Sequence, residues 1–181
     1  MRGPLISLDL WFATPFDAAA AAHEMAVNHM HHIRPEFTLQ TMKDEVWRTG
    51  NVVTVTTPGN AIDGDTNEKR AKQAMNRIRR RAERVVSSCE PVYASLFFED
   101  CIPSPDTLRA GKSWLDNVFL RTDEATMAEL EGLAVYSSRA EGWLYASFNG
   151  WFSPKRDRRR APEVDAVLTH AVLDAVVRAE A

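Results

Sequence analysis

The sequence contains little cysteine and no arrangement that would use it. Cys89 and Cys101 are the two cysteines among 181 residues, and they form neither a CxxC pair nor a disulfide framework. A disulfide-stabilised secreted scaffold is therefore excluded, and a reducing compartment is favoured. We interpret both residues as ordinary thiols, with Cys89 in the core.

Long hydrophobic runs are also missing. No apolar run approaches the roughly 18 to 20 residues that a membrane-spanning helix needs, and the first residues lead into an alternating pattern instead of the apolar core of a signal peptide. We therefore expect a cytoplasmic protein that makes no use of a membrane.

Motifs of catalysis and of metal binding are absent as well. The sequence has no GxSxG, no glycine-rich phosphate loop and no HExxH, because His23 is followed by His29 and not by a histidine at position 27. We interpret the histidines between 23 and 32 as the polar end of a helix, and Asp63-Gly64-Asp65 as a turn before the next helix. The sequence thus predicts no catalytic residue, metal or cofactor, although an enzyme whose groups converge from distant positions stays an alternative.

What is present is enough apolar sequence for one core. Apolar residues make up 45% of a chain of 181 residues, which is long enough for one sizeable core and too short for two ordinary domains. We expect a single domain over residues 1–181.

Hydrophobic periodicity predicts helices and strands in alternation. An alternating strand at 5–12 precedes a helix at 15–32, which Thr14 caps, and a hairpin at 45–56 turns at Gly50-Asn51. Apolar residues three and four positions apart predict an amphipathic helix over 66–89. Further strands are expected at 92–99, 114–121, 135–138 and 143–148, and helices at 122–133 and 162–178.

These elements predict an α+β fold. Helices with one apolar stripe need a sheet face to cover, so we expect a mostly antiparallel or mixed sheet with helices packed on one face or both. The order β-α-β-β-α occurs twice among the predicted elements, which suggests a duplicated unit with pseudo-repeat halves 1–90 and 91–181.

Charge is distributed unevenly along the chain. Eight cations fall within residues 69–84 and five within 155–160, whereas the remainder holds nine cations against 23 acids, a balance of about −14. We expect separate basic and acidic surfaces. The arginines of the 66–89 helix mostly face away from its apolar stripe, and Arg77, Arg80, Arg81 and Arg84 are candidate phosphate ligands. A solvated face paired with the protein's own acids is the structural alternative.

The acidic counterpart lies between Glu99 and Glu131. It contains a long proline-containing loop, and Trp114 near the end of that loop places an aromatic side chain beside carboxylates. The candidate residues for binding a basic protein partner are Glu99, Asp100, Asp106, Trp114 and Asp116. An ordinary acidic surface with a core tryptophan is the structural alternative.

Part of this region resembles a known class of proteins. The segment VYASLFFED (92–100), then PSPDTLR (103–109) and NVFL (117–120), resembles the small α/β immunity proteins that are encoded beside bacterial polymorphic toxins. The resemblance covers roughly a third of the chain. It implies a small, acidic, non-enzymatic bacterial protein that neutralises a toxin by occluding the toxin's active site. The arginine clusters depart from a uniformly acidic inhibitor.

Two functions follow as hypotheses. The first is a non-enzymatic binding protein that inhibits a partner protein, such as a basic toxin domain, through the loop of residues 99–116. The alternative is a nucleic-acid-associated protein, such as one encoded by a phage, that uses the basic helix.

Overall fold

A computed structural model describes residues 5–25, 45–58, 68–98, 100–152 and 161–181. The first part of the chain forms five elements: β1 (Leu5–Trp11), α1 (Pro15–Glu24), β2 (Glu45–Thr49), β3 (Val52–Pro58) and α2 (Glu68–Cys89). The second part forms β4 (Tyr93–Phe98), α3 (Pro105–Arg109), β5 (Asn117–Leu120), α4 (Glu124–Leu133), β6 (Tyr136–Ala140), β7 (Trp143–Ser147) and α5 (Val164–Glu180). The predicted α+β fold in a single domain is confirmed.

The described strands form one antiparallel sheet in the order β2-β3-β1-β4-β5-β7-β6. Within it, β1-α1-β2-β3-α2-β4 is a split β-α-β-β-α-β arrangement, in which β4 returns to pair with β1. The elements β5-α4-β6-β7-α5 follow the same path, and β4 pairs with β5 on the other side. One central strand therefore completes two similar units.

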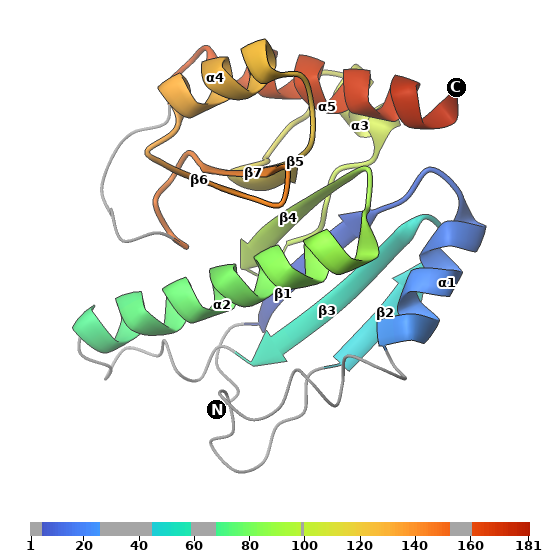
Figure 1. The fold of residues 1–181 in the computed structure, drawn as a ribbon, viewed down its shortest axis with the longest axis horizontal. Coiled ribbons are helices and arrows are strands. Elements are labelled where there is room, and N and C mark those ends of the chain that lie inside the picture. The colour runs from blue at the N-terminus through green and yellow to red at the C-terminus, as the bar shows by residue number, and fades with distance from the viewer. Residues whose placement is uncertain (1–4, 26–44, 59–67, 99, 153–160) are drawn as a thin grey trace.

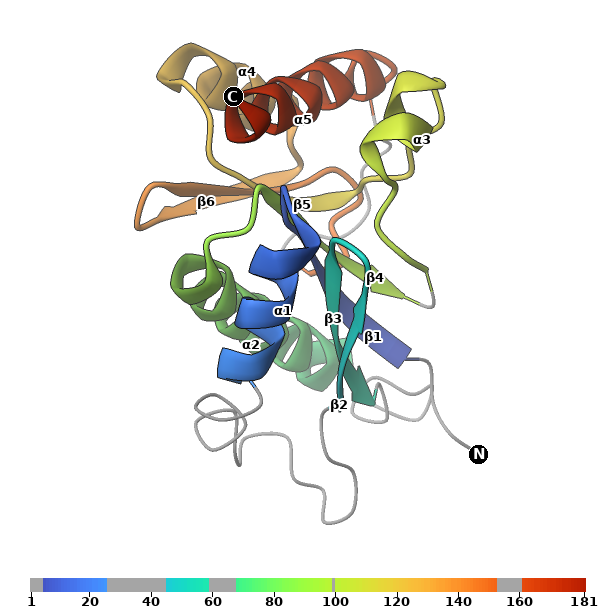
Figure 2. The same ribbon diagram turned by 90° about the vertical axis from the view of Figure 1, so that its right-hand side faces the viewer.

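Helices cover both faces of this sheet (Figures 1 and 2). On one face, α1 and α2 close a core that contains Leu8, Met75 and Phe119. On the opposite face, α3, α4 and α5 close a core that contains Phe97, Leu120 and Leu168. Because β1 and β5 both run antiparallel to β4, a pseudo-twofold axis along β4 relates the two units and exchanges the two faces.

Local sequence explains where the matching elements begin. Thr14 caps α1 by accepting from the Asp17 N–H at 3.1 Å, and Asp123 caps α4 by accepting from the Thr126 N–H at 2.9 Å. The β2–β3 turn has Gly50 at φ +58°, which is the positive φ that we expected from the tight hairpin. The cap and turn predictions for α1 and for this hairpin are confirmed.

Three features differ from expectation. The hairpin between β6 and β7 turns on two residues, Glu141 and Gly142, and not on the expected four; both take positive φ values, as a type I′ turn requires. The loop 99–116 contains the five-residue helix α3. The repeated order begins at β5, because β4 and α3 lie between the two units; common descent of the units stays a prediction.

The described part of α1 is shorter than the predicted 15–32 helix. It ends at Glu24 with Met25 as its cap. Residues 26–44, which include His29, His31 and His32, lie outside the described residues. Residues 63–65 and the basic run 155–160 are outside them too. Within the described residues, no helix combines the length and the apolar character that a membrane crossing requires.

Candidate functional site

One face of α2 carries four arginines that are exposed to solvent: Arg70, Arg77, Arg80 and Arg84. At 3.6 residues per turn and 1.5 Å per residue, they lie within an arc of roughly 80° and extend over roughly 21 Å of the helix axis. Among the residues that the structure describes, none of the four makes an ion pair or a hydrogen bond. We call these four residues the arginine ladder.

Repulsion between the side chains of the arginine ladder destabilises α2. Arg77 and Arg80 are three positions apart and Arg80 and Arg84 are four apart, and like charges at these spacings destabilise a helix by about 0.2 to 0.5 kcal/mol per pair. The acid within α2 that accepts a described ion pair, Glu83, points to another side of the helix. A bound polyanion would remove this repulsion.

Arg79 is a buried exception within a cationic cluster that otherwise mostly faces away from the apolar stripe. Arg79 is 5% exposed. Its Nη1 donates to Glu83 Oε1 at 2.7 Å and to the Ser138 hydroxyl at 3.2 Å. The guanidinium also lies 4.9 Å from the ring centre of Tyr136. Arg79 therefore attaches α2 to the β6–β7 hairpin and is not part of the ladder.

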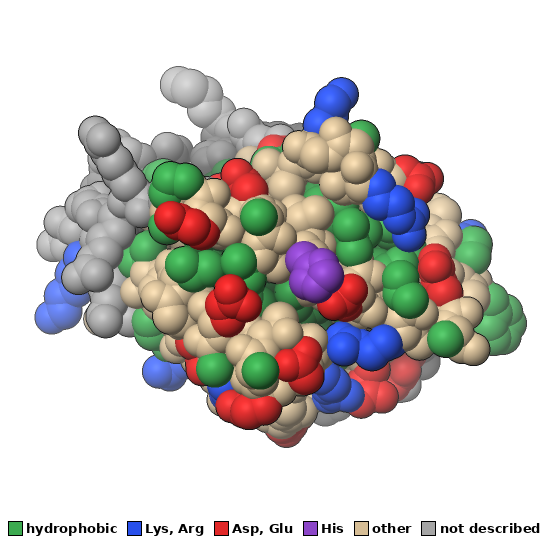
Figure 3. Space-filling model, turned by 90° about the horizontal axis from the view of Figure 1, so that it is seen from above, with side chains coloured by type: hydrophobic (Ala, Val, Ile, Leu, Met, Phe, Trp, Pro, Cys, Tyr) green, Lys and Arg blue, Asp and Glu red, His purple; other side chains and the backbone are tan. Residues whose placement is uncertain are grey.

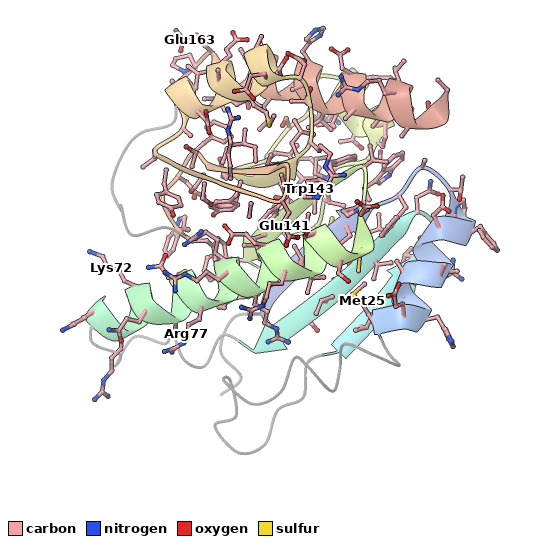
Figure 4. The ribbon with its side chains drawn as sticks, in the orientation of Figure 1. Met25, Lys72, Arg77, Glu141, Trp143 and Glu163 are labelled. Atoms are coloured by element: carbon pink, nitrogen blue, oxygen red, sulfur yellow. The ribbon has the colours of Figure 1, made fainter. Side chains whose placement is uncertain are left out.

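The other predicted arginine, Arg81, is placed differently from its neighbours. It is partly buried and lines a small apolar groove between α2 and the sheet, together with residues such as Ile78 and Leu96. Arg81 also has interactions of its own. Three of the four predicted arginines, Arg77, Arg80 and Arg84, are thus brought onto one exposed face. In Figure 4, Arg77 projects from the side of α2 that faces away from the β6–β7 hairpin.

Acidic side chains gather on the other face of the sheet, over α4 and α5. Figure 3 shows this face, where Asp and Glu side chains are spread among apolar ones. The exposed acids of α4, α5 and their first turns include Asp123, Glu124, Glu129, Glu163, Asp165, Asp174 and Glu180. Some of them are paired, since Arg139 contacts both Glu124 and Glu131 at 2.7 Å. Exposed cations such as Arg109 and Arg178 lie on this side as well, so the separation into a basic and an acidic surface stays a prediction.

The loop after β4 is held tightly against the sheet. The Ile102 N–H donates to Asp9 at 2.8 Å, Tyr93 donates to the Pro103 carbonyl at 2.7 Å, and the Trp114 indole N–H donates to the Cys101 carbonyl at 2.7 Å. These bonds join the loop to β1, to β4 and to the residues before β5. The segment 100–104 is therefore a preformed strap across the sheet.

The predicted partner-binding residues differ in their exposure and in their contacts. Asp100 and Asp106 are exposed, but Asp106 pairs with Arg109 at 2.9 Å, and Lys112 is exposed on the same loop. Asp116 has interactions within the chain. Glu99 lies outside the described residues.

Trp114 belongs mainly to the structure of the strap. It is partly buried and packs against the core beneath α3 and α5. Its indole N–H donates to the Cys101 carbonyl. Residues 100–116 thus hold three acids against two cations, and the Trp114 indole N–H is already used within the loop.

Sequence reasoning did not single out Trp151. Its side chain is 47% exposed, four residues after the end of β7, and it lies edge-on to Phe98 with the ring centres 5.2 Å apart. No local spacing distinguishes this tryptophan from a core residue. Its position shortly after a strand, beside a proline- and arginine-containing run, was the available signal.

Several buried polar groups form hydrogen bonds within the fold. Asn117 Oδ1 accepts from Ser147 at 2.8 Å and from Tyr145 at 3.1 Å, and burial raises the pKa of Tyr145 above its usual range. Burial also raises the pKa of the Cys89 thiol to about 11, so this cysteine is a poor nucleophile. Within the described ranges, no group of three or more His, Cys, Asp or Glu side chains is placed to hold a metal ion.

No protein-family model, curated protein or solved structure matches the chain. The proposed function therefore depends on the surfaces of the molecule itself.

Proposed function

We propose that this protein binds nucleic acid through the arginine ladder of α2. The observation that carries the proposal is the row of Arg70, Arg77, Arg80 and Arg84, exposed along one helix face without an ion pair in the described part of the chain. Guanidinium groups bind phosphate oxygens in a forked geometry, and a row of them suits a chain of phosphates. A helix face is also a common means of approaching nucleic acid.

The acidic remainder of the molecule fits this proposal. The chain has a net charge of −3, so the acids outside the basic clusters repel a polyanion from the other surfaces. Attraction is then restricted to the α2 face, and the nucleic acid meets the protein in one orientation. Binding would be sensitive to salt because every neutralised phosphate releases counterions.

The test replaces Arg77, Arg80 and Arg84 together by glutamine. For a single strand, log K falls with log salt by about 0.7 per phosphate contact, so the native slope of about −3 for four contacts should shrink to about −1. Fluorescence anisotropy of a labelled oligonucleotide at several salt concentrations measures both affinity and slope.

A matched control removes the same charge elsewhere. Arg48, Arg109 and Arg178 are also exposed, and the structure places them on the β2–β3 hairpin, α3 and α5. Their triple replacement by glutamine should leave the slope near its native value. If both triple variants weaken binding equally, the ladder has no special role and net charge alone governs the attraction.

Inhibition of a protein partner is the second candidate, and the preformed strap favours it. A loop that is already fixed loses little conformational freedom on binding, which is typical of inhibitory loops. Asp100 and Asp106 would face a basic surface such as a toxin domain, as the resemblance to immunity proteins implies.

Replacing Asp100 and Asp106 by lysine tests this second candidate. The fold should survive because both side chains are exposed, and a complex with a co-purified partner should form more slowly through like-charge repulsion. Unchanged association kinetics in a folded variant, checked by circular dichroism, would remove the strap from consideration.

A further inference from the structure

We propose that the nucleic acid is single-stranded and that Trp151 provides the surface on which one of its bases stacks. This inference rests on the proposed function, because the arginine ladder supplies the contacts to phosphate. It adds the class of nucleic acid and a second kind of contact.

Trp151 is supported from below by two other rings. Phe98 stacks on Phe152 with ring centres 5.0 Å apart and meets Trp151 edge-on at 5.2 Å. Phe152 is fully buried in the core beneath α2, so the aromatic group has a fixed base. The outer ring, Trp151, is the one that remains 47% exposed. A supported and exposed indole is suited to stack with a planar partner.

The indole lies at the same end of the molecule as the start of the ladder. Phe98 is the last residue of β4, and α2 begins at that end of the sheet because it ends where β4 begins. β7 contacts α2, and Phe152 shares a core with Met75 and Ile78 of that helix. Figure 1 shows the end of β7 beside the N-terminal half of α2. The ladder lies on the side of α2 that faces away from the β6–β7 hairpin, so a flexible strand would cross the N-terminal half of α2 to place phosphates along the ladder and a base on Trp151.

The combination of phosphate contacts with base stacking favours single-stranded over double-stranded nucleic acid. Bases in a duplex are stacked on each other and their faces are not accessible, whereas an unpaired base can turn toward an aromatic ring. Single-strand binding commonly combines a basic track for the backbone with aromatic rings for the bases, and it depends little on sequence. A duplex could use the ladder but not the indole.

The experiment compares three labelled ligands of equal length: oligothymidine, an oligonucleotide that lacks bases, and a duplex. Replacing Trp151 by alanine should weaken oligothymidine binding about tenfold through the lost stacking, and leave the other two ligands unaffected. Phe16→Ala is the matched control, because Phe16 is 81% exposed on α1, at the opposite end of β1 from Phe98. This control should change nothing.

A milder variant, Trp151→Phe, tests the stacking inference if the alanine variant does not fold. It retains a smaller ring, and it should lose part of the tryptophan fluorescence quenching that oligothymidine causes in the native protein. Native quenching in this variant, or native affinity for oligothymidine in a folded alanine variant, overturns the inference. Equal weakening for the base-free ligand would also overturn it, since the indole would then act on phosphate contacts.

The two proposals fail in distinguishable ways. If oligothymidine binding depends on the ladder but not on Trp151, the stacking inference is wrong and the proposed function stands. If native protein binds none of the three ligands at low salt, both are wrong.

Discussion

At the scale of single residues, Asp9 is the clearest case of a polar side chain whose role depends on the fold. It lies on β1 with 1% of its surface exposed, under the strap, where it accepts from the Ile102 N–H. Burial raises the pKa of its carboxyl group, and the hydrogen bonds from Ile102 and from the side chain of Thr54 oppose this effect only in part. The nearby charge of Asp100 adds to the increase.

This shift gives Asp9 a pH dependence opposite to that of an ordinary paired carboxylate. Because its folded pKa is above its unfolded pKa, its contribution to stability is fully present below the unfolded value of about 3.9 and is lost as pH rises through the folded value. Ionised Asp9 therefore lowers the free energy of unfolding at neutral pH. Asp123 behaves in the opposite way, since its hydrogen bonds to Thr126 lower its pKa to about 2.

Asp9→Asn should leave the protein at least as stable as the native chain at pH 7. The amide oxygen can still accept from Ile102, and the buried charge is gone, so the advantage of the variant should grow as pH rises from 4 to 7. Urea midpoints over this pH range measure it. Asp9→Ala is the control: it leaves the Ile102 N–H without an acceptor, which costs about 1 to 3 kcal/mol. A pH-independent difference between the asparagine variant and the native chain would show that Asp9 is not the group responsible.

At the scale of elements, α2 shows which structural features hydrophobic periodicity predicts and which it does not. Its apolar stripe predicted the helix and its inner face, and Ala74, Met75, Ile78 and Val86 are indeed buried. The same pattern could not separate Arg79 from Arg80, because both are cations outside the apolar stripe. What buries Arg79 is the approach of β6, which brings Ser138 and Tyr136 to that side of the helix.

Short elements were harder to predict because packing against distant parts of the chain also decides their structure. α3 has five residues, too few for periodicity, although the Ser104 cap and Pro105 at the first position are ordinary start signals. In the β6–β7 turn, Glu141 takes a left-handed conformation that its residue type disfavours, and its carboxylate accepts from the Ser87 hydroxyl of α2. Both elements depend on contacts with distant parts of the chain.

At the scale of the whole molecule, β4 joins what would otherwise be two units. It pairs with β1 on one side and with β5 on the other, and the core beneath α1 and α2 includes Phe119, Tyr145 and Phe152 from the second unit. α2 also reaches across to the β6–β7 hairpin. Neither unit can lose its structure without exposing apolar surface in the other, so we expect them to unfold together.

Leu168→Ala tests this coupling. Leu168 is fully buried on α5 in the core of the second unit, and truncating such a side chain costs about 2 to 5 kcal/mol. Hydrogen exchange read by mass spectrometry should show the slowest amides of β1 and β3 losing as much protection as those of β7. Loss confined to residues 117–180 would mean that the units unfold separately.

The α+β class, most of the helices and strands and the presence of a basic helix follow from the sequence, because these depend on spacing and on charge along the chain. The sheet order, the shared strand and the exposure of each charge follow from tertiary packing. Hydrogen-bond pairing between distant strands follows no local pattern, and an arginine is exposed or buried according to what packs beside it. The sequence therefore contained Trp151 and the arginines of α2, but the packing of β7 against α2 brought Trp151 to the end of the molecule where the arginine ladder begins.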